Sequence, residues 1–219
     1  MNTLQSPSFQ GNLYLPKYVY HGTLRKFIPG LYERLLDDSW WRKTDRDFGA
    51  GFYTTISFRQ AAKWAVKAAL DSMKTDFSEA VVLKIRVDAD QFPHFSDCLV
   101  FLGDSNPEWA RFIVDHRLDC RDDGFDPCSH HPAIIIGQMA DNKMEKVHDE
   151  YYKSEIEIKG NDKYEWYYNR MTQNQEGHHL DSLDLGNQIC FSDPGLNEML
   201  RIEKFYVLDE GTKEWIEYG

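Results

Sequence analysis

Three residues that could carry chemistry stand in short strand-like segments separated by long connections: His21, Tyr53 and Gln188. A neutral histidine can hydrogen-bond a hydroxyl group, a tyrosine can stack on a flat ring, and a glutamine amide can both donate and accept. Gly22 follows the histidine, and its N–H and C=O offer one donor and one acceptor with no Cβ in the way. Singly these residues mean little, and their significance depends on the order in which their segments follow one another.

The segments that must position these residues have local signals of their own. Residues 17–20 have the aromatic and β-branched character of a short strand, which we expect to end at His21-Gly22-Thr23. Residues 49–55 predict a glycine-flanked strand, and residues 187–191 a further one. Ser57 is a plausible N-cap for a helix, because Trp64 and five alanines follow it at helical spacing.

The rest of the chain predicts a mixed sheet with helices around it. Apolar runs predict buried strands at 80–87 and 133–137, and a last strand at 202–208. Helical patterns indicate a short helix at 31–36, a helix from Pro107 to near Arg117 and a helical turn at 194–200. We expect one α+β domain over 1–219, with an irregular N-terminal segment at 1–16 and a partly helical peripheral insertion at 145–177.

Read in order, the segments Tyr20-His21-Gly22-Thr23, 49–55 and 187–191 resemble the three strands of the diphtheria-toxin and poly(ADP-ribose) polymerase class of ADP-ribosyltransferases. Tyr53 and Trp64 are eleven positions apart, like the two nicotinamide-stacking aromatic residues of that class. The sequence is most similar to a prokaryotic branch described only as a domain of unknown function, whose Asp-Phe-Gly-x-Gly-Phe-Tyr strand is matched at 47–53. Further similarities lie at 109–113 with Arg117 and at 135–141, so the resemblance runs from about Tyr18 to Leu200.

The resemblance implies an ADP-ribosyltransferase-type fold with a split mixed sheet, NAD⁺ as substrate and a defined set of roles. His21, Gly22, Thr23, Ser57, Tyr53 and Trp64 would bind NAD⁺, with His21 on the adenosine-side ribose and Gly22 on the carboxamide. Tyr53 and Trp64 would enclose the nicotinamide cation, an attraction of about 2 kcal/mol in a desolvated slot. Gln188, Tyr53 and His21 would be the catalytic residues, Gln188 by binding the 2′-hydroxyl of the nicotinamide-side ribose.

Gln188 stands where that class of enzymes commonly has glutamate, and this leaves several functions open. An amide keeps the hydrogen bond but cannot take a proton, which makes polymer elongation a poor fit. We therefore expect a mono-ADP-ribosyltransferase with a macromolecular acceptor. The alternatives are an NAD⁺ glycohydrolase, a non-catalytic NAD⁺ or ADP-ribose binding module, and an interaction protein that uses only the fold.

Charge and hydropathy restrict the partners. The formal charge of −11 over 219 residues repels phosphate backbones, which favours a protein acceptor over nucleic acid, although Arg42, Lys43 and Arg46 could still guide a nucleic-acid end. No run approaches the roughly 18 apolar residues of a membrane span, so we expect a cytoplasmic protein without a membrane partner. The resemblance implies a bacterial or phage toxin, defence or host-modifying factor, and a toxin would imply a neutralising partner.

Cysteines and glycines suggest two other kinds of site, and we predict neither. Cys120, Cys128, His130 and His131 lie within twelve positions, yet the gap between the two cysteines is not a usual zinc-knuckle spacing. We therefore expect no metal. Gly49 and Gly51 lack the Gly-Lys-Ser/Thr sequence of a phosphate loop.

Overall fold

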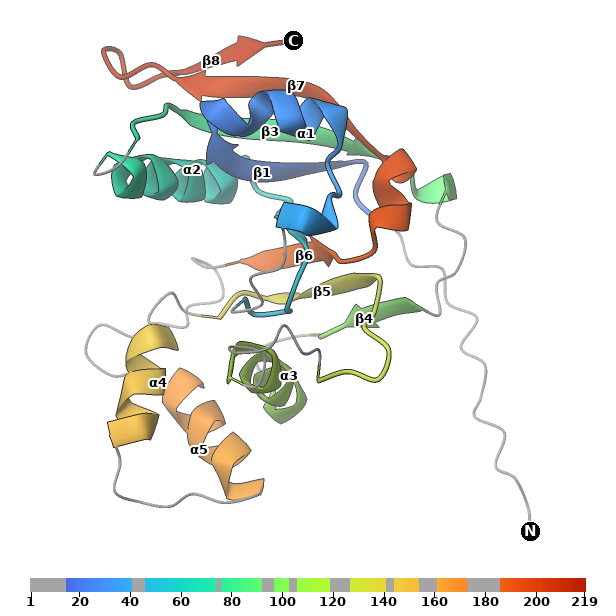
Figure 1. Ribbon diagram of the computed structural model, residues 1–219, viewed down its shortest axis with the longest axis vertical. Helices are drawn as coiled ribbons and strands as arrows, with labels where there is room; N and C mark the ends of the chain where they lie inside the picture. Colours follow the sequence, from blue (N-terminus) through green and yellow to red (C-terminus); the bar gives the residue numbers. More distant parts are fainter. Residues whose placement is uncertain are drawn as a thin grey trace.

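The computed structural model describes residues 15–40, 46–73, 76–91, 97–102, 106–118, 127–140, 144–153, 161–172 and 186–219. Within these residues the strands form two four-stranded sheets, and helices cover them on both sides (Figure 1). The α+β class expected from the sequence is confirmed, and so is a mixed sheet. None of the helices in the described ranges is long and apolar enough to cross a membrane.

The first sheet is antiparallel and has the order β1-β3-β7-β8. Its strands are β1 (Tyr18–Leu24), β3 (Ala80–Val87), β7 (Leu200–Leu208) and β8 (Trp215–Tyr218). The interior strand β3 is apolar and buried at every position except Lys84 and Arg86. Its neighbour β1 carries His21 opposite Leu83 and Gly22 opposite Val82.

The second sheet has the order β2-β6-β5-β4. Its strands are β2 (Phe52–Thr54), β6 (Asn187–Phe191), β5 (Ile134–Gln138) and β4 (Cys98–Val100). The β4–β5 pair is parallel, whereas β6 runs antiparallel to both β5 and β2. Tyr53 pairs with Cys190 in this sheet, so two of the predicted segments are neighbouring strands.

Five α-helices and several short 3₁₀ turns complete the described part of the chain. The α-helices are α1 (Ile28–Glu33), α2 (Phe58–Ser72), α3 (Pro107–Leu118), α4 (Met144–Lys153) and α5 (Asn161–Thr172). The 3₁₀ turns are Arg25–Phe27, Asp38–Trp40, Ala89–Gln91 and Pro194–Met199. The hydroxyl of Ser57 accepts from the N–H of Gln60 at the start of α2, which makes Ser57 the N-cap that the sequence predicts.

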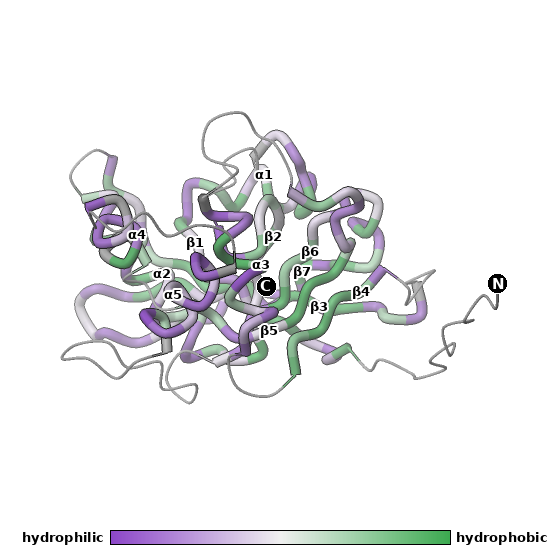
Figure 2. The backbone as a smooth tube through the Cα atoms, turned by 90° about the horizontal axis from the view of Figure 1, so that it is seen from below, coloured by the Kyte–Doolittle hydropathy of each residue, from purple (hydrophilic) through white to green (hydrophobic). Residues whose placement is uncertain are grey.

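The alternation of side chains along the strands produces a layered core. Val81, Leu83 and Ile85 of β3 pack with Ile189 and Phe191 of β6 between the two sheets. Val82 faces the other way and packs with the alanines of α2, and on the far side of the second sheet α3, α4 and α5 enclose a further apolar cluster (Figure 1). Figure 2 shows the hydrophobic segments gathered along the strands.

Besides this side-chain packing, an isolated backbone bridge joins β1 of the first sheet to the residue after β2 of the second. The N–H of Tyr20 donates to the C=O of Thr55 (2.7 Å), and the N–H of Thr55 donates to the C=O of Tyr20 (2.9 Å). Beyond Tyr20 the two strands diverge, because β1 continues along β3 while α2 begins after Ser57. The split between the sheets therefore opens beside His21 and Gly22.

Several boundaries differ from the sequence-based expectation. The first strand continues through Leu24 because His21, Gly22 and Thr23 remain paired with β3. The short helix begins at Ile28, with Pro29 in its first turn, rather than at residue 31. β4 was not predicted, and β7 is not the last strand, since β8 follows it.

The insertion predicted at 145–177 is more than a peripheral segment. Val147, Tyr167 and Met171 of α4 and α5 are buried in the cluster beneath the second sheet, together with Met144 just before the insertion. Polar residues between these positions mask the periodicity, and both helices have negative mean hydropathy. Residues 154–160 and 173–177 of this insertion, like the segments 1–14 and 41–45, lie outside the described residues.

Candidate functional site

A cavity of ≈ 800 Å³ opens where the two sheets separate. That volume is within the range of pockets that bind small molecules and cofactors. Six of the seven predicted site residues line it: His21, Gly22, Thr23, Tyr53, Trp64 and Gln188. These residues come from β1, β2, α2 and β6, so the fold brings together segments that are up to 167 positions apart in the chain, from His21 to Gln188.

The backbone of β1 presents the N–H and C=O of Gly22 to this cavity. The backbone of residue 17 bonds to Val87 of β3 and that of residue 25 to Glu79 just before β3, whereas Tyr20 bonds to Thr55 on the opposite side. Because backbone groups alternate in direction along a strand, those of Gly22 point to the same side as those of Tyr20. β2 has already turned away there, so the donor and acceptor of Gly22 face the split.

Gly22 is also the point where β1 packs directly on α2. A Cβ at this position would lie 2.1 Å from the carbonyl oxygen of Ala61 and 2.9 Å from the backbone nitrogen of Ala65. No side chain fits that space without moving the helix. The structure therefore gives a packing reason for this glycine, in addition to the ligand-binding reason that the sequence suggests.

His21 connects β1 to β2 and is held as a neutral imidazole. Its Nδ1 lies 2.7 Å from the carbonyl oxygen of Tyr53, and because a carbonyl only accepts, Nδ1 carries the proton and donates it. Nε2 is then a hydrogen-bond acceptor. Burial lowers the pKa of His21 from its usual 6.5, the bond to the Tyr53 carbonyl opposes this shift, and the nearby Arg46 charge adds to it.

Tyr53 shapes the segment that leads into β2. Its hydroxyl donates to the C=O of Gly49 (2.7 Å) and accepts from the N–H of Phe48 (2.9 Å). Its ring is stacked with that of Phe48 at a centroid distance of 6.4 Å. Burial, with smaller effects from Cys190 and Asp47, raises the pKa of Tyr53 well above its usual value, so the hydroxyl stays protonated.

Gln188 belongs to a buried polar network centred on Asp47. The Nε2 of Gln188 donates to Oδ2 of Asp47 (2.9 Å), which also accepts from the N–H of Ala140 (2.9 Å). The other carboxylate oxygen accepts from Nε of Arg117 (2.7 Å) and from its terminal Nη2. Since a carboxylate only accepts, Asp47 fixes the amide orientation of Gln188 and leaves Oε1 as the acceptor.

This network explains why position 188 can hold an amide. A glutamate there would place a second carboxylate within 3 Å of Asp47, and two like charges at that distance do not both ionise readily. Asp47 itself lines the cavity, as do Arg46 and Arg117. The site therefore contains a carboxylate, but it comes from residue 47 instead of 188.

Helix α2 forms the remaining wall. Ala61, Trp64 and Ala68 line the cavity at helical spacing, together with Gln60. Trp64 is 37% exposed, and the Nζ of Lys67 lies 5.0 Å from its ring centroid. Ser57, the seventh predicted binding residue, is not among the lining residues, because its hydroxyl is engaged as the N-cap of α2.

Sequence reasoning missed Asp47 and Gln60 as site residues. The buried Oε1 of Gln60 accepts from the hydroxyl of Thr55 (2.6 Å), and its Nε2 donates to the sulfur of Met139. Asp47 and Arg117 each lie in a motif on which the family resemblance rests. Their presence in these motifs was a signal that could have identified them as site residues. Their pairing across 70 positions has no local signature.

The fold and the cavity define a class: an α+β protein with a ligand-sized pocket where its two sheets separate, lined by apolar side chains and a smaller set of polar groups. Residues 18–202 match a family described as protein of unknown function (DUF3990), and the chain belongs to this family. This agrees with the expectation of a branch known only as a domain of unknown function. The curated proteins and the solved structures contain no significant match to the chain.

Proposed function

We propose that this protein is an NAD⁺-dependent mono-ADP-ribosyltransferase that transfers ADP-ribose to a macromolecular acceptor. The observation that carries the proposal is the convergence of six predicted NAD⁺-site residues, from four separate elements, on one cavity of ≈ 800 Å³. A chance resemblance of short motifs would not require these segments to meet. A chance resemblance would also not require the polar groups of these segments to face the same cavity.

The nicotinamide end of NAD⁺ fits the part of the cavity beside Gly22. Its carboxamide needs a donor and an acceptor at a fixed spacing, and the backbone of Gly22 presents both toward the split. Tyr53 and Trp64 provide aromatic surface for the cationic ring. The Lys67 ammonium now lies near the Trp64 ring and would have to move aside for a cation to stack on that face.

The remainder of the dinucleotide fits the neutral His21 and the basic side chains. With Nδ1 committed to the Tyr53 carbonyl, Nε2 of His21 can accept a hydrogen bond from a ribose hydroxyl. Arg46 lies close enough for its charge to lower the pKa of His21, and it lines the cavity. It is therefore the cation best suited to the diphosphate, because Arg117 is paired with Asp47.

The reaction breaks the bond between C1′ of ribose and the nicotinamide nitrogen. The electron pair leaves with nicotinamide, and C1′ gains oxocarbenium character before the acceptor nucleophile bonds to it and loses a proton. Oε1 of Gln188 would accept from the 2′-hydroxyl, while the Asp47 carboxylate, one hydrogen bond away, would favour the developing positive charge. The net charge of −11 favours a protein acceptor with a basic surface.

One observation favours a second candidate function, a non-catalytic NAD⁺ or ADP-ribose binding module. The carboxylate of the site is already neutralised by Arg117, and the Gln188 amide cannot take a proton from an acceptor. A module would bind NAD⁺ without breaking it. An NAD⁺ glycohydrolase would use the same first step with water as the acceptor.

Nicotinamide release from NAD⁺ labelled in its adenine moiety tests these functions, measured with and without cell lysate. A transferase releases nicotinamide and leaves the label on a macromolecule, whereas a glycohydrolase releases free ADP-ribose. Binding of NAD⁺ without release would identify the module. Absence of NAD⁺ binding would overturn the proposal altogether.

Gln188→Ala is the variant that tests the site assignment. We expect kcat to fall on the order of 100-fold, as when one preorganised polar group at a developing charge is removed. Asn187→Ala is the matched control, because Asn187 is the neighbouring residue of β6 and is exposed. Equal activities of the two variants would contradict the role of Gln188.

A further inference from the structure

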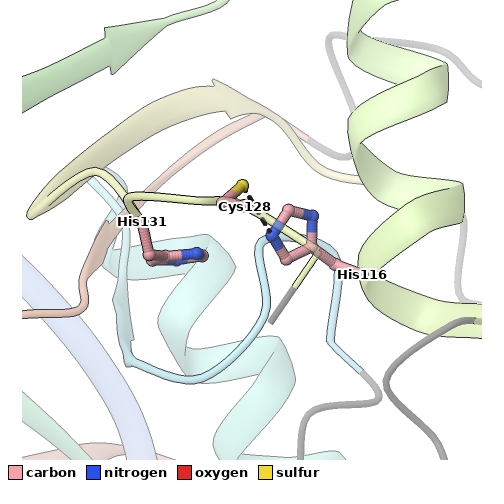
Figure 3. A group of neighbouring side chains, drawn as sticks. All are labelled: His116, Cys128 and His131. Carbon is pink, nitrogen blue, oxygen red and sulfur yellow. Dashed lines mark hydrogen bonds between the residues drawn. The ribbon is translucent and has the colours of Figure 1, made fainter. Parts of the chain in front are cut away.

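Three potential metal ligands converge beside Gly49, in the segment that leads into β2. They are His116 from the last turn of α3, and Cys128 and His131 from the chain that leads into β5 (Figure 3). Their ligand atoms all lie within 4.8 Å of one another. Figure 3 shows the sulfur of Cys128 between the two imidazole rings.

The orientation of His116 presents a basic nitrogen to the sulfur. Its Nδ1 lies 2.7 Å from the C=O of Phe112 and therefore carries the proton, which leaves Nε2 as the lone-pair nitrogen. That Nε2 lies 3.4 Å from Sγ of Cys128. A backbone carbonyl that fixes the tautomer of a histidine is the usual outer partner of a metal-binding imidazole.

The spacing of the three atoms suits a tetrahedral ion. With zinc–nitrogen bonds of about 2.05 Å and zinc–sulfur bonds of about 2.3 Å, tetrahedral geometry separates the ligand atoms by about 3.3 to 3.6 Å. One pair already has this separation, and since all three atoms lie within 4.8 Å of one another, the other separations need to shrink by at most about 1.5 Å. A rotation of one side chain can provide that adjustment.

The surroundings hold this cluster in place. His116 is buried and its ring is stacked on Phe112 at 3.9 Å between centroids, and both ring nitrogens of His131 are buried as well. Gly49, with φ of 75°, packs against both imidazoles, since a Cβ there would lie 2.9 Å from His116 and 3.2 Å from His131. The cluster thus links α3, the approach to β5 and the approach to β2.

We propose that His116, Cys128 and His131 bind one Zn²⁺ ion. Two imidazoles and a thiolate are a donor set that zinc binds well, and binding displaces the thiol proton from Cys128. The ion would fix the end of α3, where Arg117 follows His116 and holds Asp47. Its role is structural: it stiffens the wall of the cavity that contains Asp47.

This proposal reverses the expectation of no metal drawn from the sequence. That expectation considered the gap from Cys120 to Cys128, and Cys120 lies outside the described residues. The structure instead groups Cys128 with His131, three positions on, and with His116, twelve positions before it. His130 is not part of the cluster, because its Nε2 lies 2.7 Å from Oδ1 of Asp97 at the surface.

The test is the zinc content of the full-length protein, followed by titration of metal-stripped protein with Co²⁺. We expect about one zinc per chain, and cobalt absorption bands that include a thiolate-to-metal transition. Stripping zinc from the wild type should lower the melting temperature, and returning it should restore it. These measurements on the wild type do not depend on the folding of any variant.

Matched variants decide whether these three residues are the ligands. Cys128→Ser and His131→Asn should each lower the zinc content at least about tenfold, whereas Cys98→Ser and His130→Ala should retain it. Cys98 is a suitable control thiol, since burial raises its pKa to about 11 and it lies on β4, outside the group of three ligands. Zinc retained by Cys128→Ser would overturn the proposal, and so would wild-type protein that binds neither zinc nor cobalt. If Cys128 and His116 form only a thiol–imidazole hydrogen bond, the wild-type protein will bind neither zinc nor cobalt.

Discussion

The two sheets contribute to the cavity in different ways. The β1 wall presents backbone groups of Gly22 and is held by close packing on α2. The wall formed by β2 and β6 presents side chains, and a buried network of Asp47, Gln188 and Arg117 holds them. A binding surface made of backbone groups depends on how closely its strand and helix approach each other. A binding surface made of side chains depends on whether its charged groups and amides have hydrogen-bond partners.

This difference determines how each wall can be broken. Removing a side chain from the second wall leaves buried polar groups without partners, and that loss is electrostatic. At Gly22 on the first wall there is no side chain to remove, so only an added atom disturbs that contact. His21 lies between the two cases, because its imidazole joins β1 to the carbonyl of Tyr53.

Asp47→Ala should have the largest effect, since it breaks the centre of the second wall. The guanidinium of Arg117, with 18% side-chain exposure, would lose its partner, and Gln188 would lose its acceptor. We expect a loss of about 3 kcal/mol in the free energy of unfolding, measured in urea. Replacing the pair together, by Asp47→Leu with Arg117→Met, should recover much of that loss.

A surface pair provides the control for this prediction. Asp149 and Lys153 form an exposed ion pair on α4, and Asp149→Ala should change the free energy of unfolding by less than about 0.5 kcal/mol. If Asp47→Ala were as mild as Asp149→Ala, the second wall would not depend on a buried charge network.

Gly22→Ala should rank next, because it inserts an atom where β1 meets α2. The new Cβ would lie 2.1 Å from the carbonyl oxygen of Ala61, so helix and strand must separate. We expect a loss of about 1 to 3 kcal/mol by urea unfolding. Gly211→Ala in the β7–β8 turn is the control, since its Cβ would meet only the Asp209 side chain; equal losses at the two positions would contradict the packing argument.

The smallest effect should be a pH dependence of the free energy of unfolding, which arises at His21, where the two walls are in contact. Burial lowers the pKa of His21 below its unfolded value of 6.5, so the unfolded chain binds more protons at this residue as the pH falls below 6.5. Its contribution to stability is therefore present above pH 6.5 and declines as the pH falls toward the folded pKa.

His21→Asn isolates this contribution, because an asparagine amide can donate to the Tyr53 carbonyl but does not titrate in this range. Thermal unfolding from pH 5 to 8 should show a weaker loss of stability on acidification in the variant than in the wild type. Parallel pH profiles would show that His21 is not held neutral at the contact between the walls.

Much of the fold could be predicted because local patterns carry it. The apolar run of β3 and the alanine spacing of α2 with its Ser57 cap each produce an element without help from distant residues. β4 and β8 escaped prediction because they are short edge strands of three and four residues, defined by their pairing. α4 and α5 carry mostly polar residues, so only the fold reveals which of their aromatic and methionine side chains are buried.

The sequence by itself determined which short segments could come together at one site: the histidine–glycine strand, the glycine-flanked tyrosine strand and the glutamine strand. Only the tertiary structure decided how their polar groups are satisfied. Asp47 accepts from Gln188 across 141 positions and from Arg117 across 70, and His116 meets Cys128 and His131 from a different element. Hydrogen bonds and metal ligands depend on distances in space, and local spacing fixes those distances only within a single helix or strand.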